Sequence, residues 1–345
     1  MKPKVNLYGV LLFFTLFFSL IMIGHNFIVP AIVKPDNMIS LFYVRKDKNA
    51  NTFQSEIYPI AIYTHGKYVD ASKDVTDHVN RKPQDESYLA RISNFFVIAK
   101  GRILGKYHVD EISPSPFMCS SIMTGKGALK NANSLSGVFD QIEGSHASHS
   151  KGFVDKNEYD YELKWSLAAS QINSVSGAGI VVTENDIERY KADLITAGSL
   201  LLANYVSDDS TEADRGLVLD KLSVFDLDHD GQPEVSATLK KTIRKKVNAL
   251  LRTDGTDEYS NDTAYLNLWV TYKDGSPQVI LSRVSYEREA SWGSGADLVG
   301  TLDVDGDGIE EVILRVSGWE VVEFEIYAYR DSKLVRIFHG AGFGC

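Results

Sequence analysis

Two short acidic stretches near the end of the chain carry the residues best suited to chemistry. "DLDHDGQPEV" occupies residues 226–235 and "DVDGDGIEEV" occupies residues 303–312. They share acids at the same offsets: Asp226, Asp228, Asp230 and Glu234 in the first, and Asp303, Asp305, Asp307 and Glu311 in the second. Carboxylates this close repel one another, and a hard cation such as Ca²⁺ accepts about six to eight oxygen ligands. The repeated pattern predicts two cation-binding loops. The alternative is a pair of solvated polar turns without an ion.

The residues around each stretch exclude an EF-hand. That loop requires a bidentate Glu at its twelfth position and a helix on each side. The twelfth residue is Ala237 in one stretch and Leu314 in the other. The flanking segments, such as "KLSVF" before the first loop and "EVILRV" after the second, are rich in residues that favour strands. Each acidic stretch is therefore predicted to join the two strands of a hairpin.

A strand, an acidic loop with an acid at its ninth position and a second strand resemble the calcium hairpin of FG-GAP (integrin-α-like) and VCBS repeat proteins of the bacterial exported type. The resemblance covers residues 217–340, and its specificity lies in the two loops. It implies Ca²⁺ as the cofactor, bound by the eight acids named above. One backbone carbonyl in each loop, at Gln232 and at Ile309, would join them.

The second loop is expected to bind Ca²⁺ more tightly than the first. Glu310 adds a carboxylate where the first loop has Pro233, and Gly306 replaces His229 at a position where a tight turn favours glycine. Pro233 offsets part of the difference by ordering its strand. Both dissociation constants are expected on the order of 10⁻⁴ to 10⁻³ M, the range of extracellular calcium modules.

The elements that position these loops are predicted to be two β-rich units, at residues 217–286 and 297–340. In each unit the hairpin is followed by two more strand-like runs joined by a turn, for example "AYLNLWVTY", "KDGS" and "QVILSRVSY". Each unit then has four antiparallel strands, the content of one β-propeller blade. An insertion at 241–262 lengthens the first unit. Two blades cannot close a propeller, so further sheet comes from elsewhere in the chain or the arrangement is open.

The fold class predicted for the whole chain is mainly β with one or two helices. Residues 40–112 contain hairpin patterns and are expected to form a β-rich segment of their own. Residues 113–152 are rich in Ser, Gly and Asn and are predicted to be a long loop or linker. Residues 153–345 would then hold a helix and the two units.

Two helices are candidates in this last part. Thr183 and Asp186 form a capping-box pattern, and apolar residues at helical spacing continue from Ile187 to about residue 206. This helix is expected to pack on a sheet through its apolar stripe. Residues 158–172 are the second candidate.

The chain begins with a basic end followed by an apolar run. No Asp, Glu, Lys or Arg interrupts residues 7–33, and about twenty such residues span a bilayer. Lys2 and Lys4 favour a cytoplasmic N-terminus, so residues 1–34 are expected to be an uncleaved single-pass membrane anchor, with a signal peptide as the alternative. Both alternatives place the remaining chain outside the cytoplasm, in the periplasm or the extracellular space. There, Cys119 and Cys345 are expected to form a disulfide.

The composition and the motifs limit the function. A net charge of −10 without a long basic stretch argues against nucleic acid as a partner. No catalytic residue and no organic cofactor is predicted: His146 and His149 lie in a Ser-rich segment without the Glu of a zinc-protease helix. The favoured interpretation is a membrane-tethered, non-enzymatic calcium-binding β module that binds a protein or a glycan. The alternative is an exported hydrolase with structural calcium and an unrecognised active site.

Overall fold

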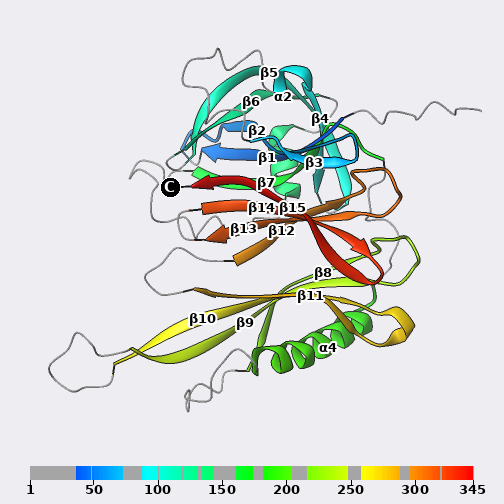
Figure 1. Ribbon diagram of the computed structural model, residues 1–345. Helices are drawn as coiled ribbons and strands as arrows, with labels where there is room; N and C mark the ends of the chain where they lie inside the picture. The colour runs from blue at the N-terminus through cyan, green and yellow to red at the C-terminus, as the bar shows by residue number, and fades with distance from the viewer. Residues whose placement is uncertain are drawn as a thin grey trace, which may run out of the picture. The chain divides into compact units, whose positions relative to one another are not determined.

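A computed structural model of the chain describes most residues from 36 onward. The described ranges are 36–47, 49–72, 88–99, 101–117, 120–130, 134–142, 161–173, 182–203, 216–247, 258–287, 295–318 and 321–344. They are mainly β-strands in antiparallel sheets, which confirms the predicted fold class at this level. Figure 1 shows the strands in sequence colours, with helix α4 beside the yellow-green strands.

The first sheet is seven-stranded and covers residues 37–169. Its strands are β1 (Asn37–Asp47), β2 (Phe53–Thr64), β3 (Lys67–Asp70), β4 (Asn94–Ala99), β5 (Arg102–Phe117), β6 (Ser120–Lys130) and β7 (Tyr161–Ala169). They lie in the order β1-β7-β4-β5-β6-β2-β3, and β1 also pairs with β2, so the sheet closes on itself. Two short helices, α2 (Tyr88–Arg91) and α3 (Leu135–Gln141), accompany these strands.

Strand β1 is buried on both faces. Met38, Phe42 and Val44 belong to a core shared with residues of β4, β5 and α3. The alternate residues Ile39 and Leu41 belong to a second core on the opposite face. Successive side chains of a strand point to opposite sides of the sheet, so this continuous apolar run serves two cores at once.

The prediction of a loop at residues 113–152 is wrong for the part of this segment that the structure describes. Strand β5 extends to Phe117, and β6 and α3 follow it. Ile122 and Met123 of β6 are buried. The glycines allow close strand pairing: a Cβ on Gly127 would lie 1.8 Å from the carbonyl oxygen of His108 on β5. The glycine-rich composition was therefore interpreted as a loop, whereas the glycines allow the backbones of β5 and β6 to approach closely.

The prediction of a helix at residues 158–172 is also wrong, because residues 161–169 form strand β7. Trp165 and Leu167 belong to one core and Ala168 to the other, which is the two-residue period of a strand. Strand β7 pairs with both β1 and β4. A boundary near residue 153 would therefore divide the strands of a single sheet.

The two predicted β units are present as two four-stranded antiparallel sheets. The first consists of β8 (Val218–Phe225), β9 (Glu234–Val247), β10 (Glu258–Thr271) and β11 (Gln278–Glu287), with the short 3-10 helix η3 (Lys273–Gly275) between β10 and β11. The second consists of β12 (Gly295–Leu302), β13 (Glu311–Gly318), β14 (Val321–Arg330) and β15 (Lys333–Gly344). In the insertion predicted at 241–262, β9 and β10 remain paired as far as Val247 and Glu258.

Helix α4 (Glu184–Ala203) begins where the capping box predicts. The Thr183 hydroxyl donates to Asp186 Oδ2 (2.7 Å) and accepts from the Asp186 N–H (3.2 Å). Tyr190, Leu194 and Leu202 pack against apolar residues of β9 and β10. The helix therefore covers one face of the first four-stranded sheet, as its apolar stripe indicated.

Within residues 36–345, which form one compact unit, the sheets pack in layers (Figure 1). Ile313, Phe324 and Ile326 of the β12–β15 sheet pack against β1, β2 and β7. Val312 and Leu314, on the opposite face, pack against Trp269 and other residues of the β8–β11 sheet. The β12–β15 sheet therefore lies between the seven-stranded sheet and the β8–β11 sheet, and α4 covers the far side of the latter.

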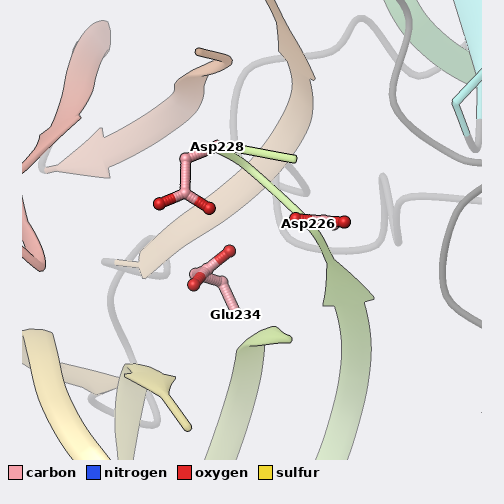
Figure 2. A group of neighbouring side chains, drawn as sticks. All are labelled: Asp226, Asp228 and Glu234. Carbon is pink, nitrogen blue, oxygen red and sulfur yellow. The ribbon is translucent and has the colours of Figure 1, made fainter. Parts of the chain in front are cut away.

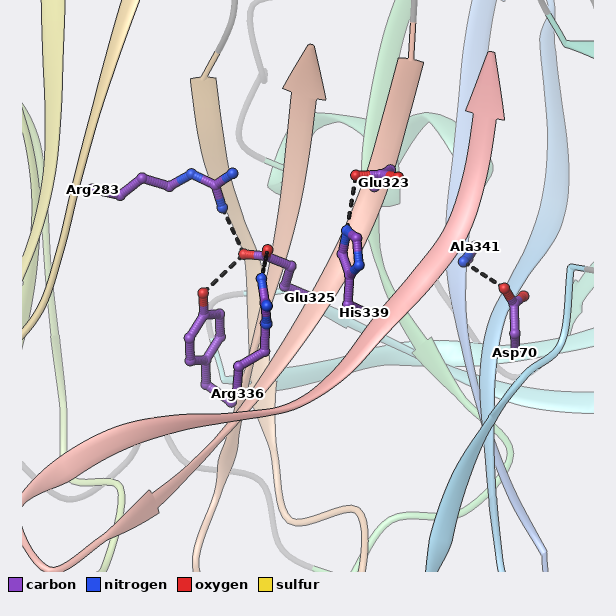
Figure 3. Close-up of polar contacts among 8 residues, drawn as sticks. Asp70, Arg283, Glu323, Glu325, Arg336, His339 and Ala341 are labelled. Carbon is purple, nitrogen blue, oxygen red and sulfur yellow. Dashed lines mark hydrogen bonds and ion pairs between the residues drawn. The ribbon is translucent and has the colours of Figure 1, made fainter. Parts of the chain in front are cut away.

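Polar contacts also join these layers (Figure 3). Glu325 on β14 is 1% exposed and accepts hydrogen bonds from Arg283 of β11 (2.6 Å) and Arg336 of β15 (2.7 Å). The Ala341 N–H of β15 donates to Asp70 Oδ2 at the end of β3 (2.9 Å). Each interface between neighbouring sheets thus contains at least one buried or half-buried polar contact that fixes their alignment.

The prediction of a single-pass membrane protein is corrected. No helix in the described part of the chain is long and apolar enough to cross a bilayer. The apolar run at residues 7–33, on which the prediction rested, lies outside the described residues, as do Cys119 and Cys345.

Candidate metal sites

The first acidic loop connects β8 to β9. Carboxylate oxygens of Asp226, Asp228 and Glu234 lie within 4.8 Å of one another, and Figure 2 shows the three side chains around a common space. Asp226 follows the last residue of β8, and Glu234 is the first residue of β9. The two strands therefore bring acids eight residues apart to the same point, and this group can hold a metal ion.

Glu234 closes the loop from inside the protein. It is 1% exposed and its Oε2 accepts the Leu227 N–H at 2.9 Å. Its Oε1 accepts the hydroxyl of Thr271 on β10 at 3.0 Å, and that hydroxyl lies 3.4 Å from the Tyr329 hydroxyl on β14. Asp228 Oδ1 is buried and has no hydrogen-bond partner among the described residues. Glu234 therefore ties the loop to two sheets, while Asp228 Oδ1 keeps its lone pairs for another ligand.

The second loop has the same form between β12 and β13. Carboxylate oxygens of Asp303, Asp305 and Asp307 lie within 4.8 Å of one another. Glu311 Oε2 accepts the Val304 N–H at 2.8 Å, as Glu234 accepts that of Leu227. Asp303 accepts the N–H groups of residues 306 and 308, at 2.6 and 3.2 Å. This second group can also hold a metal ion.

Burial and mutual repulsion make the charged forms of these acids costly. Burial, and then the nearby Asp305 and Asp307, raise the pKa of Glu311 to about 8. Burial, with a contribution from Asp228, raises the pKa of Glu234 to about 7. Burial, followed by the charges of Asp230 and Asp226, also raises the pKa of Asp228. Each loop therefore holds acids that a positive charge would stabilise in their ionised forms.

The two loops turn with the same backbone pattern. Gly306 and Gly308 have φ of 72° and 91°, and at the matching positions His229 and Gly231 have φ of 57° and 81°. A side chain with a Cβ is strained in this left-handed region, whereas glycine is not. The expectation that Gly306 relieves the tight turn is consistent with the backbone, and His229 adopts the conformation that glycine adopts more easily.

Residues far from the loops in sequence hold the second loop in place. The Asn37 side chain donates to the Val304 carbonyl (3.1 Å) and that of Asn173 to the Asp303 carbonyl (3.1 Å). The Glu310 N–H donates to the Leu227 carbonyl at 2.8 Å and so joins the two loops directly. Sequence reasoning missed these contacts, as it missed Thr271, because a single Asn or Thr in a strand-rich segment carries no signal of its distant partner.

The predicted ligands are only partly brought together. The groups contain Asp226, Asp228 and Glu234 from the first loop and Asp303, Asp305 and Asp307 from the second. Asp230 and Glu311 are outside these groups. Asp230 accepts the Gln232 N–H at 2.7 Å, and Glu311 accepts that of Val304, as Glu234 accepts that of Leu227. Ligation by these two acids and by the carbonyls of Gln232 and Ile309 stays a prediction. His146 and His149 lie outside the described residues.

No protein-family model, no curated protein and no solved structure matches this chain.

Proposed function

We propose that this protein is a non-enzymatic calcium-binding β module, in which two metal loops stiffen neighbouring sheets that present a surface to a partner. The observation that carries the proposal is the repetition: two hairpins, in two four-stranded sheets, each bring three carboxylates within 4.8 Å. Solvated polar turns would not be expected to show the same convergence twice. They would also not be expected to bury the last acid of each loop, Glu234 and Glu311.

The donor atoms favour Ca²⁺ among biological cations. Both groups offer carboxylate oxygens and neither contains His or Cys, the donors that select zinc or copper. Ca²⁺ accepts many oxygens in flexible geometry, which suits a loop whose remaining ligands are backbone carbonyls and water. The likeness to FG-GAP and VCBS calcium hairpins belongs to this proposal, and the position of each loop between the first two strands of its sheet supports it.

A metal ion in either loop would stabilise more than its own hairpin. The hydrogen bond from Glu310 to Leu227 joins the loops, and Glu234 reaches β10 and, through Thr271, Tyr329 of β14. Neutralising the carboxylates would therefore strengthen the contact between the β8–β11 and β12–β15 sheets. Calcium would then have a structural role, because it would make the sheets that present the partner-binding surface more rigid.

Calorimetric titration of the full chain with CaCl₂ tests the proposal. We expect two binding events, the tighter one removed by Asp305→Asn and the weaker one by Asp228→Asn. Asp331→Asn, in the exposed turn between β14 and β15, is the matched control and should retain both events. The proposal fails if wild-type protein takes up no calcium, or if both variants titrate like the wild type.

A further inference from the structure

A cleft of about 470 Å³ lies where the three sheets meet. It is bordered by β8 and β9 of the first four-stranded sheet, by β12 of the second, and by parts of β4 and β7. The volume falls within the range of roughly 300–1,000 Å³ that is usual for ligand pockets. The sequence contains no signal for this cleft, because its walls come from segments as far apart in sequence as Ile98 and Leu314.

The residues that border the cleft show that it lies along two strand edges. Its walls include the consecutive residues 221–225 of β8 and 296–301 of β12. Successive side chains of a strand point to opposite faces, so a cleft on one face would be bordered by every second residue. Unbroken runs on both strands place the open space beside their backbones.

Both edges are unpaired toward the cleft. Among the described residues, β8 pairs only with β9 and β12 only with β13. The two edges are held apart at a fixed spacing by contacts near either end. The Lys221 ammonium lies 3.1 Å from Asp297 Oδ1, and beyond the other end the Glu310 N–H donates to the Leu227 carbonyl. Unpaired strand edges offer rows of N–H and C=O groups to any chain that can pair with them.

The walls suit a polypeptide better than a sugar. Ser223, Ser236 and Asn267 line the cleft and can bond peptide groups or side chains. Its aromatic residues already have packing partners: Phe225 stacks on Trp269, with ring centroids 5.4 Å apart, and Arg315 lies 4.8 Å above the ring of Trp165. These contacts reduce the aromatic surface on which a sugar ring could stack.

The charges at one end of the cleft define the preferred peptide. Asp297 lies between two cations, with Lys221 at 3.1 Å and Arg315 Nη1 at 3.7 Å. Arg315 Nε is buried and has no hydrogen-bond partner among the described residues. One carboxylate is thus shared by two cations, and Lys221, which lines the cleft, can pair with an acidic side chain from a ligand.

We propose that the edges of β8 and β12 form a slot that binds an extended, acidic peptide segment of a partner protein by strand addition. The segment would pair with roughly five residues of β8, the length of the bordering run, and extend its sheet. This inference names the partner class of the binding module proposed above and rests on that function. It does not require calcium at the loops, so the two proposals can fail separately.

Selection of random peptides displayed on phage against the full chain, with CaCl₂ present, tests the slot. Enriched peptides are synthesised, their affinities are measured by calorimetry, and amide hydrogen exchange of the full chain is compared with and without peptide. We expect enrichment of acidic sequences that slow exchange in β8, in β12 or in both. Lys221→Glu should weaken their binding by about tenfold, since it reverses the charge that meets the acidic side chain.

Two further variants make the test specific. Ser223→Trp should block the slot and abolish peptide binding, whereas Lys333→Glu, at an exposed position on β15, should leave affinity unchanged. The proposal is overturned if no peptide is enriched, if the enriched peptides slow exchange only elsewhere, or if neutral oligosaccharides slow exchange in β8 and β12 while peptides do not. Peptide binding in the slot without any calcium uptake would instead overturn the calcium proposal alone.

Discussion

Raising the pH should destabilise this protein when it is free of divalent cations. The cause is the last acid of each loop. In the folded state the pKa is about 8 for Glu311 and about 7 for Glu234, whereas the usual value for Glu is 4.5. Between the usual and the raised value, the folded protein retains a proton that the unfolded chain has released. The free energy of unfolding therefore falls as pH rises through this window.

The expected loss is large for a single domain. Each fully shifted group changes the free energy of unfolding by about 1.4 kcal/mol per pH unit. From pH 5 to pH 7 this amounts to about 2.5 kcal/mol for Glu311 and about 2 kcal/mol for Glu234. Glu325 does not mask the trend: burial raises its pKa, but hydrogen bonds from Tyr327 and Arg336 lower it overall, so it titrates below this window.

Urea unfolding followed by tryptophan fluorescence measures the effect. The protein is unfolded at pH 5, 6, 7 and 8, with a chelator in one series and excess CaCl₂ in the other. With the chelator, stability should fall by about 4.5 kcal/mol from pH 5 to pH 7, continue to fall toward pH 8 and level off only above it. With calcium the fall should be reduced, because the ion stabilises the ionised carboxylates and binds only the folded state.

A variant assigns the effect to one residue. Glu311→Gln keeps an oxygen that can accept the Val304 N–H but removes the titrating proton, so the loss of stability from pH 5 to pH 7 in chelator should fall by about half. Glu188→Gln, on the exposed face of α4, should leave this loss as it is. A stability that is flat or rises between pH 5 and pH 7 without cations would refute the reasoning.

Three further outcomes are expected. His229→Gly should raise the free energy of unfolding by about 1 kcal/mol and tighten cation binding at the first loop, because His229 has φ of 57°; unchanged stability in urea unfolding would contradict this. Gly127→Ala should cost about 3 kcal/mol or prevent folding, since its Cβ would lie 1.8 Å from the His108 carbonyl oxygen. Gly216→Ala, whose Cβ has no atom within 4 Å, is the control for thermal denaturation. Thr183→Ala should cost about 1 kcal/mol through loss of the cap on α4, measured as increased amide exchange in the first turn of the helix.

The sequence determined the elements whose signals are local. The two acidic stretches connect strands, as their flanking residues predicted, and three acids of each stretch converge. Helix α4 begins at its capping box because Thr183 and Asp186 satisfy each other within one turn. Each of these features depends on residues close in sequence, so their types and spacing are sufficient to predict them.

The wrong predictions concern segments whose structure depends on distant partners. Strand β6 contains two glycines and was predicted to be part of a loop, yet its pairing with β5 makes it a strand of the closed sheet. Strand β7 was predicted to be a helix, and it is inserted between β1 and β4. The residues of each segment do not by themselves predict its pairing, because intrinsic strand propensity is weak compared with the effect of burial between neighbouring strands.

What only the tertiary structure decided is the environment of the acids and the existence of the slot. Asn37, Asn173 and Thr271 contact the two acidic loops from strands and connections far away in sequence. The burial of Glu234 and Glu311, which raises their pKa values, results from the packing of whole sheets upon one another. The cleft between β8 and β12 exists because two separate sheets end at the same place. Desolvation and the meeting of strand edges are properties of the assembled layers, and no short stretch of residues encodes them.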